Sequence, residues 1–121
     1  SYLKICFDTG HHSYAGFDPI NFMRRHIHRI SYLHFKDIDP VVKADVVSKR
    51  TDFYSACGQG IFCNLGDGDV DFKKVRELLV ENDFDGWCTV EQDCDPEGKT
   101  SPIHDAKINR KYLEALGFTN A

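Results

Sequence analysis

Three short apolar segments of this 121-residue chain end on a side chain that commonly binds metal ions, and helix-like sequence follows each segment. The segments cover residues 3–8, 31–34 and 87–91, and they end on Asp8, His34 and Glu91. Strands that alternate with helices pair in parallel, and an α/β barrel builds its sites from the carboxyl ends of such strands. The sequence therefore predicts an α/β fold in which two carboxylates and one imidazole meet around a divalent metal ion.

The period-two alternation of side chains along a strand strengthens this interpretation. Each predicted ligand shares its face of the strand with polar or mixed residues, which are Lys4 and Cys6, Tyr32 and Lys36, and Trp87 and Thr89. The opposite faces are apolar and carry Ile5 and Phe7, Leu33 and Phe35, and Cys88 and Val90. We expect the apolar faces to pack under helices and the mixed faces to point into a barrel interior, where they can line a polar pocket.

Capping residues and apolar spacing predict three longer helices. The first begins at Asp18, the second runs from Asp71 to 82–83, and the third covers 101–116 before Gly117. The apolar residues expected to face the core are Ile20, Met23 and Ile27 in the first helix, Phe72, Val75, Leu78 and Leu79 in the second, and Ala106, Leu113 and Leu116 in the third.

Residues 38–66 separate the second strand from the second helix and are too many for a plain connection. We interpret them as a long loop insertion that holds a short helix over 45–54, because such loops are often lids or binding loops. The glycine-rich stretch 66–72 that follows is interpreted as a structural turn, since its aspartates would repel an anion such as phosphate.

The length of the chain bounds the architecture. It is enough for one small domain, so we predict a single domain over 1–121. Three βα units do not close a barrel of eight, and three strands alone leave two unpaired edges. We therefore expect a partial (β/α)8 TIM barrel of about three βα units. Its missing strands would come from another chain or from an N-terminal barrel half outside this sequence.

Composition disfavours several classes of function. The formal net charge of −4 argues against nucleic acid as a partner, and we interpret the basic stretch 24–29 as a solvated helix end. No apolar run approaches the roughly 20 residues that span a bilayer, so no membrane association is expected. Five cysteines without a CxxC pair favour free thiols and a reducing, cytoplasmic location over a disulfide framework, with Cys57–Cys63 as the alternative pair.

Three further side chains lie close to the predicted ligands in the sequence. His11 follows Asp8 by three residues and can point into the same pocket as a substrate contact or second metal contact. Lys36 shares a strand face with His34 and could stabilise an enolate or hold a hydroxyl, while Asp37 could fix the loop or pair with Lys36. The alternative for each is an ordinary surface or turn residue. Oxygen, nitrogen and oxygen ligands favour Mn²⁺ or Co²⁺, with Mg²⁺ and Zn²⁺ as alternatives.

Four motifs stand in the order found in a known family, and they are Asp8-Thr9-Gly10-His11, His34-Phe35-Lys36-Asp37, the turn at 65–72 and the segment 86–91. In these motifs the chain resembles the C-terminal part of the xylose isomerase-like TIM-barrel superfamily of sugar isomerases, epimerases and dehydratases. Within it the likeness is chiefly to the inosose dehydratase branch, which acts on 2-keto-myo-inositol. The resemblance implies four metal ligands at successive strand ends. Asp8, His34 and Glu91 match the last three, and the first, a glutamate, lies outside this sequence.

The resemblance also implies a function, that of a metal-dependent lyase of inositol catabolism that dehydrates a keto-inositol. Glu91 or the glutamate outside the sequence would remove a proton, and His11 or Lys36 would act on the departing hydroxyl. The residues expected to contact the polyol or keto-sugar are His11, Lys36 and Asp37. A homo-oligomer is expected.

Three other interpretations stay open. One is a ketose 3-epimerase or hydroxypyruvate-type isomerase of the same superfamily, although the 38–66 insertion and Lys36 favour the dehydratase. Another is an abasic-site endonuclease, whose branch has a similar Asp-Thr-x-His motif but an asparagine at the position of Lys36. The last is a non-catalytic binding fragment.

Overall fold

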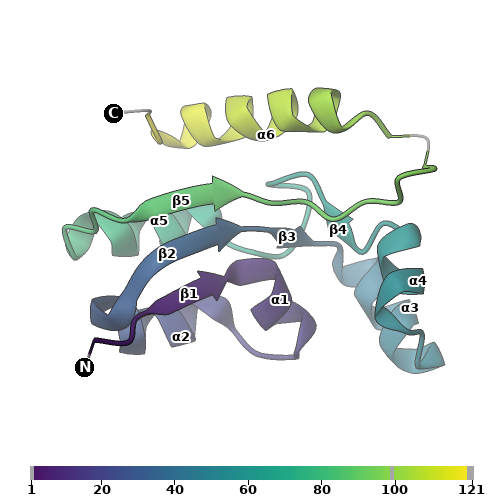
Figure 1. Ribbon diagram of the computed structural model, residues 1–121, viewed down its shortest axis with the longest axis horizontal. Coiled ribbons are helices and arrows are strands. Elements are labelled where there is room, and N and C mark those ends of the chain that lie inside the picture. The colour runs from purple at the N-terminus through teal and green to yellow at the C-terminus, as the bar shows by residue number, and fades with distance from the viewer. Residues whose placement is uncertain (1, 99, 120–121) are drawn as a thin grey trace.

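The chain builds a parallel sheet from the three segments that the sequence marks as strands (Figure 1). The computed structural model describes residues 2–98 and 100–119, so Ser1 and Ala121, where the predicted domain begins and ends, lie outside the described residues. Strand β1 (Ile5–Asp8) pairs in parallel with β2 (Ile30–Phe35), which pairs in parallel with β5 (Trp87–Val90). The predicted α/β fold is confirmed, and among the described residues β1 and β5 form the two edges of this sheet.

The three helices that capping and apolar spacing predict are present, and they are α2 (Pro19–His26), α5 (Phe72–Glu81) and α6 (Pro102–Leu116). Each begins after a side chain whose oxygen accepts a backbone N–H of the first turn, and these caps are Asp18, Asp71 and Ser101. Gly117 ends α6 with a φ of 95°, a backbone conformation that favours glycine.

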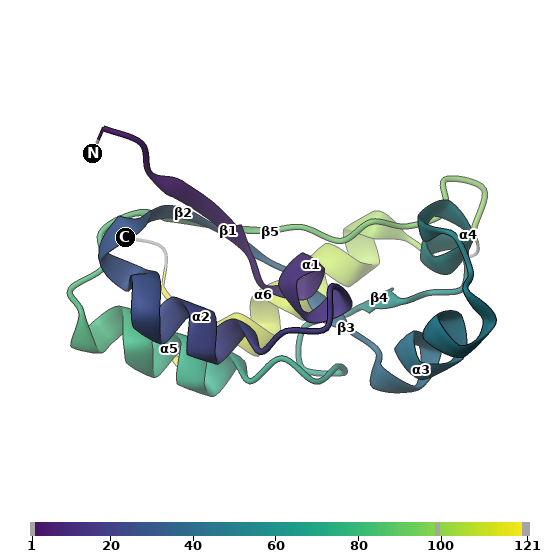
Figure 2. The same cartoon turned by 90° about the horizontal axis from the view of Figure 1, so that it is seen from below.

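The helices lie on one side of the sheet, as the alternation of apolar and mixed faces predicts. In Figure 2, α2 and α5 pack side by side beneath the strands, and the other face carries no helix within residues 2–98 and 100–119. Phe7, Leu33 and Phe35 are buried on the helix side. On the open face Trp87 is 78% exposed. The polar site is therefore built on the uncovered face of the sheet.

The inward face of α6 differs from the prediction. Ala106, expected to face the core, is exposed, while Asn109 is the buried residue of this helix. Leu113 and Leu116 are half-buried and pack against the core. The helix is placed by the polar contacts of Asn109 as well as by apolar packing.

Two short helical segments are not predicted from the sequence. α1 (Thr9–Tyr14) begins directly after β1, and the 3-10 turn η1 (Ile27–Arg29) takes Ile27 out of the first predicted helix. α1 has only six residues, too few to show an apolar stripe at helical spacing. Its first turn is held instead by Asp8, whose side chain accepts the N–H of His11.

The segment 38–66 is more ordered than the loop that the sequence suggests. It holds two helices, α3 (Pro40–Lys49) and α4 (Phe53–Gly58), in place of one over 45–54. Arg50, with a φ of 53°, ends the first helix, and the Asp52 side chain caps the second. β3 (Asp37–Ile38) and β4 (Phe62–Cys63) pair antiparallel near the two ends of this segment, which we call the excursion 38–66. Both helices of the excursion lie beyond the carboxyl ends of the main strands (Figure 1).

The cysteines are free thiols, as the sequence predicts. All five lie in the described part of the chain and form no disulfide there, so Cys57 and Cys63 are not bridged. Burial raises the pKa of the Cys63 thiol to about 12 and that of Cys88 to about 11. Both therefore stay protonated at neutral pH. In the same described residues, no helix combines the length and apolar character that crossing a membrane requires.

Candidate metal centre

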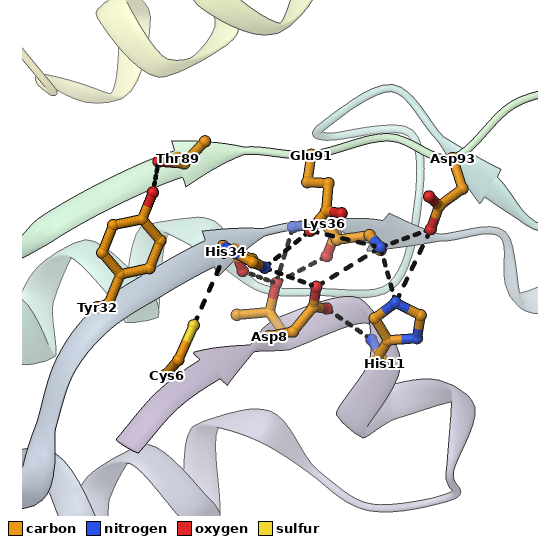
Figure 3. A network of polar contacts seen from close by, with 10 residues as sticks. Cys6, Asp8, His11, Tyr32, His34, Lys36, Thr89, Glu91 and Asp93 are labelled. Carbon is orange, nitrogen blue, oxygen red and sulfur yellow. Dashed lines mark hydrogen bonds and ion pairs between the residues drawn. The ribbon is translucent and has the colours of Figure 1, made fainter. Parts of the chain in front are cut away.

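Asp8, His34 and Glu91 converge at the carboxyl end of the sheet, as the sequence predicts (Figure 3). One ligand atom of each residue lies within 4.8 Å of the others. His34 Nδ1 is 2.7 Å from Glu91 Oε2 and 3.6 Å from Asp8 Oδ2. The imidazole nitrogen thus lies within reach of a carboxylate oxygen from each neighbouring strand.

The strand register explains why one acid is an aspartate and the other a glutamate. Asp8 on β1 lies directly beside His34 on β2, and His34 lies beside Thr89 on β5. Along the chain from Thr89, the next residue with the same strand parity is Glu91, which is the first residue after β5. Its longer side chain spans the extra step back to His34 Nδ1.

Asp8 combines a structural and a ligand-type role in one carboxylate. Its Oδ1 accepts the backbone N–H of His11 at 2.8 Å and so caps α1. Its Oδ2 is buried and has no hydrogen-bond partner among the described residues. A buried acceptor without a hydrogen bond is costly, and the ion pair with Lys36 Nζ at 3.5 Å does not supply one, whereas a bound cation would satisfy the oxygen. This orphaned oxygen fits the idea that the three residues hold a metal ion.

Lys36 lies at the centre of the polar network, because its Nζ reaches four neighbouring side chains (Figure 3). It lies 2.7 Å from Asp93 Oδ2 and 2.8 Å from His11 Nε2. The distances to Asp8 Oδ2 and Glu91 Oε2 are longer, at 3.5 and 3.8 Å. The side chain is 0% exposed, so the alternative that Lys36 is a surface lysine is wrong.

The charges of this network also fit a divalent cation. Three carboxylates, from Asp8, Glu91 and Asp93, surround a single ammonium group. With both histidines neutral, two negative charges are left over. A divalent ion on Asp8, His34 and Glu91 would balance them, and oxygen and nitrogen donors suit Mn²⁺ or Co²⁺.

The residues after Asp8 form the wall against which Lys36 is packed. The hydroxyl of Thr9 donates to the carbonyl of Lys36 at 2.7 Å and accepts its N–H at 3.1 Å. A Cβ at Gly10 would lie 2.5 Å from Lys36 Cγ. Gly10 lies in α1, and its lack of a side chain leaves room for the lysine stem.

His11 points into the same network, as predicted, while His12 faces away from it. The ring of His11 stacks on Phe53 at 5.7 Å and meets the edge of Phe62 at 5.2 Å, so the excursion 38–66 supplies an aromatic wall beside it. His12 packs against Phe7 on the helix side of the sheet. Burial there lowers the pKa of His12, against a smaller opposing effect of nearby Asp18.

Asp37 does not face the site, although a substrate contact is predicted for it. The residue is fully buried, and its carboxylate accepts the N–H groups of Ile38, Gly66, Gly68 and Val70. Burial raises its pKa, and these backbone bonds oppose that shift. Asp37 therefore holds the glycine-rich turn, which agrees with the structural reading of 66–72. Sequence reasoning could not find its partners, because they lie about 30 positions away in the chain.

Asp93 has no role predicted from the sequence, yet its side chain lies in the network. Asp93 lies two residues after Glu91, and its side chain makes the shortest contact of Lys36 Nζ. The same alternation that groups Trp87, Thr89 and Glu91 on one face would have marked it. Between the two acids, Gln92 accepts the amide of buried Asn109 at 3.0 Å, and Asn109 in turn accepts the N–H of Leu65 at 2.8 Å.

A comparison with protein families matches residues 1–118 to a family model described as xylose isomerase-like TIM barrel. Among curated proteins, the inosose dehydratase of Clostridium tetani (strain Massachusetts / E88) is 41% identical over 112 residues, which are 93% of this chain and 37% of that protein. The inosose dehydratase of Geobacillus kaustophilus (strain HTA426) is 37% identical over 114 residues, 94% of this chain and 37% of that protein. The chain thus spans 37% of the length of these relatives.

Two solved structures share the fold. The probable 3-DHS dehydratase involved in petrobactin synthesis from Bacillus anthracis superimposes with a TM-score of 0.62 at 20% identity, over 97% of this chain and 39% of that one. A D-tagatose 3-epimerase-like protein superimposes with a TM-score of 0.55 at 21% identity, over 93% of this chain and 35% of that one. Both likenesses concern the fold, and they agree with a partial TIM barrel.

Proposed function

Because the chain belongs to the xylose isomerase-like TIM barrel family, we propose that it carries three metal ligands of an enzyme that dehydrates 2-keto-myo-inositol. The observation that carries this proposal is the meeting of Asp8, His34 and Glu91 within 4.8 Å, beside the buried Asp8 Oδ2 that lacks a hydrogen-bond partner. The inosose dehydratases of Clostridium tetani and Geobacillus kaustophilus, at 41% and 37% identity, support the choice of reaction.

The three ligands would hold a divalent ion, with Mn²⁺ or Co²⁺ as the favoured metals. When bound, such an ion polarises a ketone oxygen and makes the proton on the neighbouring carbon easier to remove. A fourth ligand, the glutamate that the resemblance implies, lies outside these 121 residues. We propose that it comes with the rest of the barrel, from further sequence or from a second chain.

Exposure separates the groups that could touch a substrate from those that could not. The side chains of His11 and Glu91 are each 42% exposed, whereas that of Lys36 is 0% exposed. We therefore assign proton removal to the Glu91 carboxylate and contact with the departing hydroxyl to His11. Lys36 does not touch the substrate and acts as a fixed positive charge that stabilises negative charge on the reacting oxygen. The direct substrate contact predicted for Lys36 does not fit its burial.

Dehydration removes a proton from carbon and a hydroxyl group from the substrate, and we assign these tasks to two side chains. The Glu91 carboxylate accepts the proton from carbon and passes it to the leaving hydroxyl, which departs as water while His11 holds it by a hydrogen bond. Phe53 and Phe62 shield one side of His11 from water. An apolar wall of this kind favours proton transfer to the bound substrate over exchange with solvent.

The test is activity of the protein as its gene encodes it, after metal removal and addition of Mn²⁺ or Co²⁺. We expect metal-dependent conversion of 2-keto-myo-inositol to a dehydrated dione, followed by absorbance. His34→Ala should abolish turnover, and His28→Ala, which changes an exposed histidine outside the site, should preserve it. No dehydration with Mn²⁺, Co²⁺, Mg²⁺ or Zn²⁺ would refute the proposal. Epimerisation of a free ketose instead would establish the isomerase alternative.

A further inference from the structure

The Lys36 ammonium group has three donor hydrogens and four polar side chains near it, and it makes short contacts with two of them. An ammonium group donates hydrogen bonds and accepts none. The two short contacts of Nζ go to Asp93 Oδ2 at 2.7 Å and His11 Nε2 at 2.8 Å. The contacts with the metal-ligand carboxylates of Asp8 and Glu91, at 3.5 and 3.8 Å, are ion pairs without hydrogen-bond geometry. Of the three carboxylates near the Lys36 ammonium group, that of Asp93 is thus the one that accepts a hydrogen bond from it.

The contact with Lys36 also fixes the tautomer of His11. Since the ammonium group donates, His11 Nε2 must accept, and the ring proton of the neutral imidazole then lies on Nδ1. Asp93 Oδ2 is 3.8 Å from the same Nε2, too far to take a proton from it in a hydrogen bond. His11 is therefore oriented through Lys36, and Lys36 is anchored by Asp93.

We propose that Asp93 is a positioning residue that holds the Lys36 ammonium group on His11 Nε2 and away from Asp8 and Glu91. The catalytic role of Asp93 in this inference rests on the proposed function, whereas the contact of Asp93 with Lys36 does not depend on it. Asp93 is well placed for the task, because Glu91 and Asp93 lie on the same side of the chain and Gln92 between them is held by buried Asn109. Without the Asp93 charge, Nζ would turn toward the metal-ligand carboxylates and release His11.

The first arm of the test measures the tautomer of His11 by ¹⁵N NMR of the imidazole rings, at a pH above the ordinary histidine pKa of about 6.5. The wild-type chain should show an unprotonated Nε2 and a protonated Nδ1 for His11. Asp93→Asn should shift His11 toward a mixture of both tautomers. Asp95→Asn removes a carboxylate two residues further on, one that accepts the N–H of Glu97, and should leave His11 unchanged.

The second arm measures steady-state kinetics on the protein as its gene encodes it. Asp93→Asn should lower kcat by about 10- to 100-fold, the usual cost of losing an outer-shell partner, with little change in KM. Asp93→Glu should restore part of kcat, because it returns the charge, and Asp95→Asn should match the wild type. A merely structural role would lower the yield of folded protein without this division between kcat and KM.

The outcomes separate this inference from the proposed function. A wild-type His11 with its proton on Nε2 would overturn the inference, even if the variant failed to fold. So would an Asp93→Asn variant that keeps the wild-type tautomer and kcat. If the wild-type protein did not dehydrate the keto-inositol, the proposed function would fail, and the NMR arm alone would decide on Asp93.

Discussion

At the scale of single residues, the space next to Gly10 is filled by Lys36. Every atom of the Lys36 side chain is buried, so its stem needs a neighbour without a side chain where α1 crosses it. A Cβ at position 10 would lie 2.5 Å from Cγ and 2.8 Å from Cβ of Lys36. Thr9 holds the backbone of Lys36 through two hydrogen bonds and Asp93 binds its Nζ, so the stem between them has little freedom to move aside.

Gly10→Ala should therefore destabilise the protein by about 1–3 kcal/mol, the usual cost of overpacking a well-filled interior. Chemical denaturation measures this change. The matched control is Gly58→Ala at the end of α4, where an added Cβ meets no described atom within 4 Å. Equal stabilities of the two variants would contradict the tight packing of Lys36 against α1.

His12 should make stability depend on pH, because burial lowers its pKa in the folded state. The unfolded chain then binds the proton more readily. The contribution of His12 is complete above the ordinary pKa of about 6.5 and is lost as the pH falls through the lower folded-state value. His12→Phe keeps an aromatic ring beside Phe7 and Phe22. It should lose less stability than the wild type between about pH 8 and pH 5.

Denaturation curves at several pH values test this expectation. His28→Phe, which changes an exposed histidine, serves as the control and should keep the wild-type dependence on pH. An identical loss of stability on acidification in the wild type and in His12→Phe would show that the His12 proton does not matter.

Some site residues could be predicted from the sequence, and the reason others could not is physical. Asp8, His34, Lys36 and Glu91 follow from strand alternation, which a single chain displays directly. Asp37 is an aspartate like the predicted ligand Asp8, yet its carboxylate binds backbone N–H groups, and no sequence pattern reveals these partners.

At the scale of elements, caps were the most informative signals. Each predicted cap of α2, α5 and α6 was confirmed, because an Asp or Ser before a proline or an apolar stripe acts locally. The excursion 38–66 was predicted less well. Its two helices are separated by the left-handed Arg50, which is an uncommon conformation for a residue with a side chain.

The attachment of α6 depends on Asn109 as well as on its apolar residues. The Asn109 side chain accepts the N–H of Leu65 and donates to Gln92, so it joins α6 to the turn before α5 and to the strand end that carries Glu91. Asn109→Leu keeps the volume but leaves the Leu65 N–H without its acceptor. We expect a loss of about 1–3 kcal/mol in unfolding free energy.

Thermal or chemical unfolding of Asn109→Leu measures this loss. The neighbouring Arg110→Ala removes only an exposed ion pair with Glu114, and it should cost no more than about 0.5 kcal/mol. If the two substitutions had the same effect, Asn109 would not be the residue that secures α6.

At the scale of the whole molecule, the polar network lies on the uncovered face of a sheet with two edge strands. The relatives that share 37–41% identity with this chain are longer, and the chain spans 37% of each. Strand alternation could predict that this face carries the polar residues, whereas the part of the barrel that would cover it cannot be derived from these residues. Three of the proposed metal ligands come from this chain, so substitutions among its residues test them in the protein as its gene encodes it.

The most direct measurement is titration of the metal-free protein, as its gene encodes it, with Mn²⁺, with free Mn²⁺ followed by electron paramagnetic resonance. We expect one Mn²⁺ per chain, loss of that binding in His34→Ala, and unchanged binding in His28→Ala. Stoichiometric Mn²⁺ binding retained by His34→Ala, or none in the wild type, would contradict the proposal that Asp8, His34 and Glu91 surround one cation.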